Sequence, residues 1–325
     1  MKMNRNHIWL LLPVLMLAAG SVFAKQHDVT ECGTEIDQPG KYRLMNDMSC
    51  APDVSGVWIT APDVTLDLRG HTISCDASGD ELVAAVIIGG DVDPPSQMFL
   101  ENVRVRNGTA SGCDDGILLW FSVGAKVSKM NLENNIDGGI TLVVATNSEI
   151  KNNRFMNNGI GIGSWWGGSG NLIKGNYISY VGSAIDLNQE TDSNIKCNIV
   201  EQSFFGISAG PYSTGNTLQG NLVIDGFSGI MLYGVEHLPV PPDDPEIAPV
   251  ASGNLVKHNV ALGNFMDMSE IVYVLATGDV YVDPGDTCQN SWMNNQFGFE
   301  MGPSNCIGLP VELDEDDVCA LDADD

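Results

Sequence analysis

The stretch "NLIKGNYISYVGSAIDLNQETDSN", residues 171–194, decides the fold because it contains one complete unit of a repeat. Its apolar pieces "NLIKG", "YIS" and "AIDL" are separated by glycine, asparagine and serine, which favour turns. Each piece is rich in β-branched residues and is too short for a helix. The stretch therefore predicts three short β-strands joined by turns.

Similar units recur along the chain with a spacing of 22 or 23 residues. One series consists of a small residue followed by isoleucine, at Gly116–Ile117, Gly139–Ile140, Gly161–Ile162, Ala184–Ile185, Gly206–Ile207 and Gly229–Ile230. A second series consists of asparagines, at Asn131, Asn153, Asn176, Asn198 and Asn221. Two series that share one period of 22 or 23 residues are typical of a solenoid. Each unit predicts one coil of an all-β parallel helix, with isoleucines stacked inside and asparagine amides bonded along the axis.

The predicted solenoid has about 9–10 coils, which stack about 4.8 Å apart. The asparagine series continues at Asn259 and Asn295, after gaps of 38 and 36 residues. These gaps predict loop inserts at residues 234–252 and about 270–287. Loops that leave a rigid solenoid often border a binding groove, and the alternative is a surface loop without a role.

The N-terminus predicts export. Lys2 and Arg5 precede an apolar run at residues 8–19, and small residues follow up to Ala24. This pattern is that of a signal peptide covering residues 1–24, which places the protein in the periplasm or outside the cell. No later stretch approaches about 18 apolar residues, so we expect no transmembrane segment. The β-helix would then cover residues 25–311, and an acidic tail residues 312–325.

The eight cysteines all lie after the predicted signal peptide, and an even number in an exported chain indicates disulfides. Two pairs would close short local loops, and we expect Cys32–Cys50 and Cys288–Cys306 on that ground. The pairing of the other four stays open. The sequence has no C-x-x-C pair, so a zinc site is not expected.

The charge restricts the partners. The formal charge is −27, and it becomes −29 when Lys2 and Arg5 are removed with the signal peptide. Such a chain repels nucleic acid, and it repels acidic polysaccharides unless cations or a local basic patch intervene. The cofactor stays unknown from the sequence. Calcium binding by the acidic tail is an alternative to a solvated tail, although the tail lacks a calcium-loop motif.

Two N-terminal stretches resemble a known family. "CGTEIDQPGKYRLMNDMSC", residues 32–50, and "APDVTLDLRGHTISC", residues 61–75, are similar to the first coils of NosD-like proteins. These proteins form a branch of the pectin-lyase-like superfamily. The resemblance implies a single-stranded right-handed parallel β-helix over nearly the whole chain after the signal peptide. It does not specify a function, because the superfamily includes lyases, hydrolases, epimerases and adhesins.

Alignment of the coils on the buried isoleucine predicts an outward face with an unusual composition. Its aromatic and polar candidates for substrate binding are Trp120, Trp165, Trp166, Asn188, Glu190, Tyr212 and Tyr233. Flat rings beside amides and carboxylates suit sugars, which have an apolar face and a hydroxyl rim. The alternative is that the rings pack beneath the insert at residues 234–252.

Acidic residues provide candidates for catalysis. Asp114 and Asp137 precede the isoleucine by three residues on adjacent coils, which predicts carboxylates roughly 5 Å apart. Such a pair suits a glycosidase or a bound cation, and ordinary turn formation is the alternative. Asp186 and His237 are the other acid–base candidates.

The segment "CDDGILL", residues 113–119, is similar to the double-aspartate segment of polygalacturonases. However, the chain lacks the Gly-His-Gly and Arg-Ile-Lys motifs of those enzymes. It also lacks the Asp-Pro-His-Asp/Glu motif of mannuronan epimerases, since "DVDPP" at residues 91–95 has no histidine. The catalytic signatures of both enzyme groups are therefore missing.

Lysines form a further row, two residues before the asparagines. The row contains Lys129, Lys151, Lys174 and Lys196, and it continues to Lys257. It could bind a polyanion, or it could balance the acidic residues and oppose edge-to-edge association. Lys151, Lys174 and Lys196 are the candidates for substrate contact.

The sequence thus predicts an exported, monomeric β-helix protein. We expect it to bind, and potentially to cleave, a polysaccharide or cell-surface glycan by lyase or hydrolase chemistry. The alternative is a non-catalytic binding or structural solenoid.

Overall fold

The computed structural model describes residues 26–77, 82–89, 99–236, 247–248, 251–274, 279–281, 288–301, 306–313 and 319. The predicted signal peptide at residues 1–24, most of the acidic tail at 312–325, and His237 lie outside the described residues. Within the described ranges, no helix has the length and hydrophobicity that a membrane span requires.

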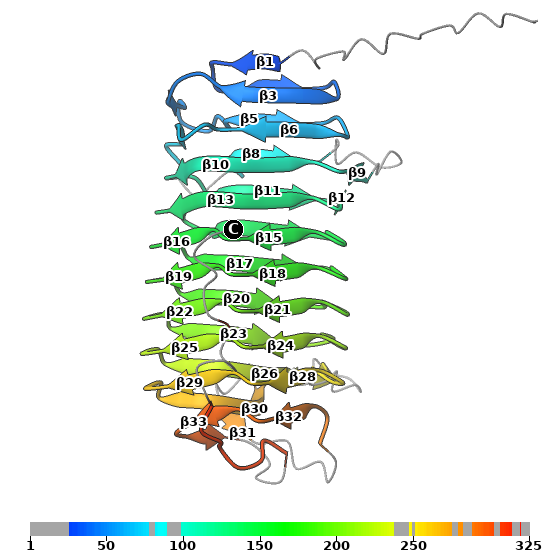
Figure 1. Ribbon diagram of the computed structural model, residues 1–325, viewed down its shortest axis with the longest axis vertical. Coiled ribbons are helices and arrows are strands. Elements are labelled where there is room, and N and C mark those ends of the chain that lie inside the picture. Colours follow the sequence, from blue (N-terminus) through cyan, green and yellow to red (C-terminus); the bar gives the residue numbers. More distant parts are fainter. Residues whose placement is uncertain are drawn as a thin grey trace, which may run out of the picture.

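The predicted unit of three strands is confirmed. In the stretch from 171 to 194, the chain forms β18 (Leu172–Lys174), β19 (Tyr177–Ser179) and β20 (Ser183–Leu187), with turns between them. Each strand pairs in parallel with the equivalent strand of the next coil. Figure 1 shows the resulting stack, with β1 (Gln26–Val29) at one end and β33 (Gln296–Phe297) near the other.

One side of the coil forms a 13-stranded sheet. Its parallel strands are β2 (Thr34–Ile36), β5 (Val57–Ile59), β8 (Ala84–Ile88), β11 (Asp115–Trp120), β14 (Gly138–Val143), β17 (Ile160–Trp165), β20, β23 (Phe205–Ala209), β26 (Ser228–Glu236), β30 (Met266–Val274) and β34 (Glu300–Met301). Its inward side chains include the predicted isoleucine stack. Ile117 to Ile230 align coil by coil and are fully buried.

The other sides of the coil belong to a 19-stranded sheet. From β13 (Lys126–Glu133) onward, one row of its strands continues through β15 (Glu149–Lys151), β18, β21 (Asn194–Lys196), β24 (Thr217–Gln219), β28 (Leu255–Lys257) and β32 (Ser291–Met293). A second row consists of β16 (Arg154–Met156), β19, β22 (Ile199–Glu201), β25 (Leu222–Ile224), β29 (Val260–Leu262) and β33. The core lies between the sheets, where the inward apolar side chains of the stacked strands form one buried cluster.

The asparagine ladder is confirmed from Asn153 onward. Each buried amide donates from Nδ2 to Oδ1 of the asparagine on the next coil, through Asn153, Asn176, Asn198, Asn221, Asn259 and Asn295. The prediction was wrong for Asn131, which is exposed. β13 continues through this position as a single strand of eight residues, and the backbone N–H of Met130 donates to Asn153.

The inserts extend the 13-stranded sheet. β26 and β30 each have nine residues and continue side by side beyond the length of a normal coil strand. Each also pairs with an antiparallel strand, β27 (Ile247–Ala248) on β26 and β31 (Asp279–Tyr281) on β30.

Four disulfides connect all eight cysteines. Both predicted local pairs, Cys32–Cys50 and Cys288–Cys306, are present. The remaining pairs are Cys75–Cys113 and Cys197–Cys319, and the second joins residues 122 positions apart.

Candidate functional site

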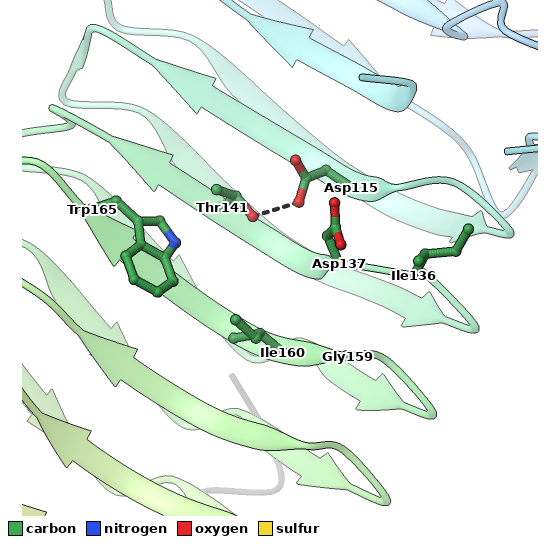
Figure 2. A pocket seen from close by; sticks show the side chains of 7 residues that line it. All are labelled: Asp115, Ile136, Asp137, Thr141, Gly159, Ile160 and Trp165. Atoms are coloured by element: carbon green, nitrogen blue, oxygen red, sulfur yellow. Dashed lines mark hydrogen bonds between the residues drawn. The ribbon is translucent and has the colours of Figure 1, made fainter. Parts of the chain in front are cut away.

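A pocket of about 490 Å³ lies on the 13-stranded sheet, over β11, β14 and β17. Figure 2 shows its lining residues, which are Asp115, Ile136, Asp137, Thr141, Gly159, Ile160 and Trp165. The volume is within the usual range of ligand pockets. Two carboxyl groups, a hydroxyl group and an indole ring therefore line one pocket.

Asp115 occupies the first position of β11, opposite Gly138 of β14. The hydroxyl of Thr141 donates a hydrogen bond to its Oδ1. A Cβ atom at position 138 would lie 2.6 Å from this oxygen and 2.3 Å from the Thr141 Oγ1. Gly138 is thus required for the Asp115–Thr141 contact.

The electrostatic environment of Asp115 favours its protonated form. The side chain is almost fully buried, and its pKa is raised to about 7, with burial as the largest cause. The negative charges of Asp137 and Asp114 contribute to this rise, while the hydrogen bonds from Thr141 and the Gly138 backbone oppose it. By contrast, Asp137 is exposed. The pocket therefore contains two carboxyl groups in different environments.

The predicted catalytic pair, Asp114 and Asp137, requires a correction. The two residues are neighbours on adjacent coils, and the Asp137 N–H donates to the Asp114 carbonyl over 2.9 Å. However, the Asp114 side chain is buried, and its Oδ2 accepts a hydrogen bond from the Val83 N–H. Because the chain turns between Asp114 and Asp115, it is Asp115 that lines the pocket with Asp137.

Trp165 contributes the indole ring of the pocket, at the end of β17. A Cβ at position 163 would lie 2.8 Å from the Trp165 Nε1, so the indole folds back over Gly163. Gly163 therefore allows the indole ring of Trp165 to cover the outer face of β17.

The other predicted aromatic residues are more dispersed. Trp120 is half-buried and meets the exposed Trp166 edge-on, with ring centroids 6.3 Å apart. Tyr212 is exposed, and Tyr233 is half-buried. None of these four residues lines the pocket. The alternative that the rings pack beneath the insert concerns residues 237–246 and 249–250, which lie outside the described chain.

Asp186 and Asn188 form a second polar cluster on the same sheet. Asp186 is paired with Gly163 on one side and with Ser208 on the other. The Ser208 hydroxyl donates to the Asp186 Oδ1 over 2.9 Å, and burial raises the Asp186 pKa. The Tyr233 hydroxyl donates to the Asn188 Oδ1 over 3.4 Å. Both predicted residues are half-buried and lie one coil from the Trp165 strand.

Glu190 does not belong to the outer face, and its placement there was wrong. Its side chain is 1% exposed. Hydroxyl groups of Ser164 and Ser193 and the Nδ2 of Asn171 donate to its carboxylate. The residue links neighbouring coils inside a turn, so it is not placed for contact with a ligand on the sheet.

The lysine row lies away from the pocket. Lys151, Lys174 and Lys196 stack in register on β15, β18 and β21 of the 19-stranded sheet. Gln219 and Lys257 continue the row. Lys129 was wrongly included, because Ser128 is the residue in register with Lys151.

Sequence reasoning missed a column of exposed phenylalanines. Phe204, Phe227 and Phe265 are 54%, 37% and 68% exposed, and their rings stack with centroids 4.7 Å and 5.2 Å apart. Their spacing of 23 and then 38 residues equals that of Asn198, Asn221 and Asn259. Alignment of this position in the repeat would have revealed the column.

In the described part of the chain, no group of three or more His, Cys, Asp or Glu side chains could hold a metal ion. This finding does not cover the predicted candidate His237 or most of the acidic tail.

A family model described as "Periplasmic copper-binding protein (NosD)" matches residues 96–181. This match confirms the resemblance to NosD over that segment. The segment contains no histidine, and its one cysteine, Cys113, is bonded to Cys75. The segment therefore offers copper neither an imidazole nor a free thiol, which are two of its preferred ligands. Comparison with curated protein sequences gives no match.

Several solved structures have the same fold. The A-module of the mannuronan C-5 epimerase AlgE4 from Azotobacter vinelandii has a TM-score of 0.51 and 10% sequence identity. The alignment covers 89% of this chain and 87% of that module. The catalytic domain of a GH87 α-1,3-glucanase in complex with nigerose has a TM-score of 0.58 and 11% identity, with coverage of 86% and 60%.

A third similar structure is the tailspike protein of E. coli bacteriophage HK620 in complex with a pentasaccharide. Its TM-score is 0.56 and its sequence identity is 13%. The alignment covers 84% of this chain and 58% of the tailspike chain. The present chain thus spans less than two thirds of the glucanase domain and of the tailspike. These likenesses show that the chain is a right-handed parallel β-helix.

Proposed function

We propose that this protein is an exported polysaccharide-binding β-helix protein that hydrolyses glycosidic bonds at the pocket of Asp115 and Asp137. The observation that carries the proposal is the difference between the two carboxyl groups. One is buried with a pKa of about 7, and the other is exposed in the same pocket beside Trp165. Glycoside hydrolases usually act through two carboxyl groups, of which one is protonated and the other ionised because their environments differ.

In the proposed reaction, protonated Asp115 donates its proton to the oxygen of the scissile glycosidic bond. The bond between this oxygen and the anomeric carbon breaks, and positive charge develops on the sugar. A water molecule then forms a bond to the anomeric carbon and gives a proton to the Asp137 carboxylate. Proton exchange with solvent restores both residues. Trp165 would hold the sugar by contact with its apolar face.

Hydrolysis fits the pocket better than elimination by a lyase. Abstraction of a proton from a sugar carbon leaves negative charge, which a nearby cationic group would stabilise. None of the seven lining residues is basic, and two are acidic. A positively charged transition state is favoured by such surroundings, whereas a negatively charged one is opposed.

Two further observations support the assignment. The three similar structures named above are a mannuronan epimerase, a glucanase bound to nigerose and a tailspike bound to a pentasaccharide. This support is an analogy at the level of the fold. Export is supported by the predicted signal peptide and by the four disulfides, which are typical of oxidising compartments.

Non-catalytic binding is the second candidate. Asp115, Asp186 and Asn188 all have hydrogen-bond partners within the sheet, from Thr141, Ser208 and Tyr233. Such bonds also stabilise a fixed binding surface without any reaction.

The test is a screen of polysaccharides for binding and for release of reducing ends, with the wild type and the Asp115→Asn, Asp137→Asn and Trp165→Ala variants. The proposed reaction requires that both aspartate variants lose cleavage and keep binding, and that Trp165→Ala weakens binding. Binding without cleavage by the wild type would support the second candidate. Cleavage retained in both aspartate variants would contradict the assigned pocket.

A further inference from the structure

The phenylalanine column lies in line with the pocket. Gly138, Ile160, Ser183, Phe205, Ser228 and Met266 pair successively from coil to coil. The residues that directly precede them therefore form one column along the helix axis, which is Asp137, Gly159, Gly182, Phe204, Phe227 and Phe265. The column begins at two pocket residues and ends at the stacked rings.

The middle of this column has no side chains that project from the surface. Gly159 and Gly182 are exposed and have no side chains. Phe204 is three coil steps from Asp137, or about 14 Å at the normal strand spacing. In the column, the Phe204 ring has Phe227 stacked on one side, while Gly182 on its other side has no side chain. The exposed glycine backbone therefore separates the pocket from an aromatic end wall.

The phenylalanines are not explained by the core. Their side chains remain 37–68% exposed, although the interior of the same coils is filled by Ile207, Ile230 and Met268. Phe205 adds a fourth ring, edge-on to Phe204 with a centroid distance of 4.7 Å. A contiguous exposed apolar surface of this kind marks an interaction site.

The charge of the protein restricts the partner. At a formal charge of −27, two copies of this chain repel each other, and an acidic polysaccharide is also repelled. The lysines that could offset this repulsion stack on the 19-stranded sheet. An uncharged partner meets no such repulsion. A polymer of repeated units also matches a surface that repeats once per coil.

We infer that the column from Gly159 to Phe265 is an extended subsite for a neutral, linear polysaccharide whose reacting bond lies at Asp115 and Asp137. This inference rests on the proposed function and adds to it the chemical class of the substrate and the direction in which the chain lies. The polysaccharide follows the helix axis over the two glycines and contacts the phenylalanine rings with its apolar C–H groups.

The first experiment is affinity gel electrophoresis in gels that contain mannan, xylan or laminarin as neutral polymers, and alginate or polygalacturonate as acidic ones. The proteins are the wild type, the triple variant Phe204→Ala/Phe227→Ala/Phe265→Ala, the single variant Phe265→Ala and the control Met293→Ala. Met293 is 52% exposed and lies on β32 of the 19-stranded sheet. The single variant at the end of the column keeps the test valid if the triple variant does not fold.

We expect the wild type and the Met293 variant to be retarded by a neutral polymer and not by the acidic ones. The triple variant should lose about tenfold or more in affinity, and Phe265→Ala a smaller part of it. Equal retardation of wild type and phenylalanine variants would overturn the subsite while leaving the proposed function intact. Retardation by acidic polymers alone would overturn the inferred substrate class.

The second experiment separates the subsite from the pocket by calorimetry with a disaccharide and a decasaccharide of the polymer that binds. Loss of the phenylalanines should weaken binding of the decasaccharide and leave the disaccharide unchanged. An equal loss for both lengths would contradict an extended subsite. If the wild type binds no polymer in the first experiment, both the subsite and the proposed function are rejected.

Discussion

The raised pKa of Asp115 affects the stability of the protein as well as the chemistry of the pocket. Its pKa is raised to about 7 in the folded state, from the ordinary value of 3.8 for an aspartate. Between these values the folded protein retains a proton that the unfolded chain has released. Stability contributed by this proton is therefore present at low pH and is lost as the pH rises through about 7.

Replacement of Asp115 by Asn should therefore have an effect on stability that depends on pH. The amide cannot ionise, so the variant escapes the cost of a buried charge, which amounts to about 4 kcal/mol above pH 7. We expect the variant to be more stable than the wild type at pH 8 and no more stable at pH 4. Urea unfolding at both pH values measures this difference. A gain of the same size at both, or a similar gain in the exposed control Asp53→Asn, would contradict the raised pKa.

Glu190 leads to a different prediction because its role is structural. Glu190→Ala removes the carboxylate that accepts hydrogen bonds from the buried hydroxyl groups of Ser164 and Ser193 and from the amide of Asn171. We expect a loss of about 2–4 kcal/mol in the free energy of unfolding, with a smaller loss in Glu190→Gln. Denaturant unfolding provides the measurement. Unchanged stability in the alanine variant would show that these hydrogen bonds make no net contribution to the free energy of unfolding.

At the scale of the coil, the asparagine ladder joins the turns of neighbouring units. The Asn176 Oδ1 accepts bonds from both the backbone N–H and the Nδ2 of Asn153, and its own Nδ2 donates to Asn198. Asn176→Ala should cost about 2–4 kcal/mol, because buried donors lose their acceptor. Asn194→Ala, at an exposed asparagine on β21, is the matched control and should change stability little. Equal unfolding midpoints for the two variants would argue against the ladder as a source of stability.

The coil is also the scale at which the sequence was most informative. The isoleucine and asparagine spacings specified the strands and the stacked interior because every coil must bury the same apolar positions. The period did not specify where a strand continues through a turn, as at Met130 in β13. It also did not specify which of two adjacent aspartates turns inward, and this choice decided whether Asp114 or Asp115 faces the pocket. Glu190 was misplaced because two of its partners, Ser164 and Asn171, lie on the preceding coil.

For the whole molecule, the Cys197–Cys319 disulfide closes the longest loop. In the chain-entropy description, a bond between residues 122 apart stabilises the fold by about 4–5 kcal/mol, and one between residues 18 apart by about 3 kcal/mol. We therefore expect the pair Cys197→Ser/Cys319→Ser to lower the melting temperature more than Cys32→Ser/Cys50→Ser. Calorimetry of the two double variants tests this order, and the opposite order would contradict it.

The same disulfide determines how the rod transmits mechanical load. In a solenoid, each coil is held mainly by its neighbours, so tension on the last coil would peel the units away one after another. Here a pull applied to the chain at residue 319 acts through the covalent bond on Cys197, between β21 and β22. The coils built from β22 onward are bypassed by the load. Their phenylalanine surface would remain intact while force is carried by the middle of the rod.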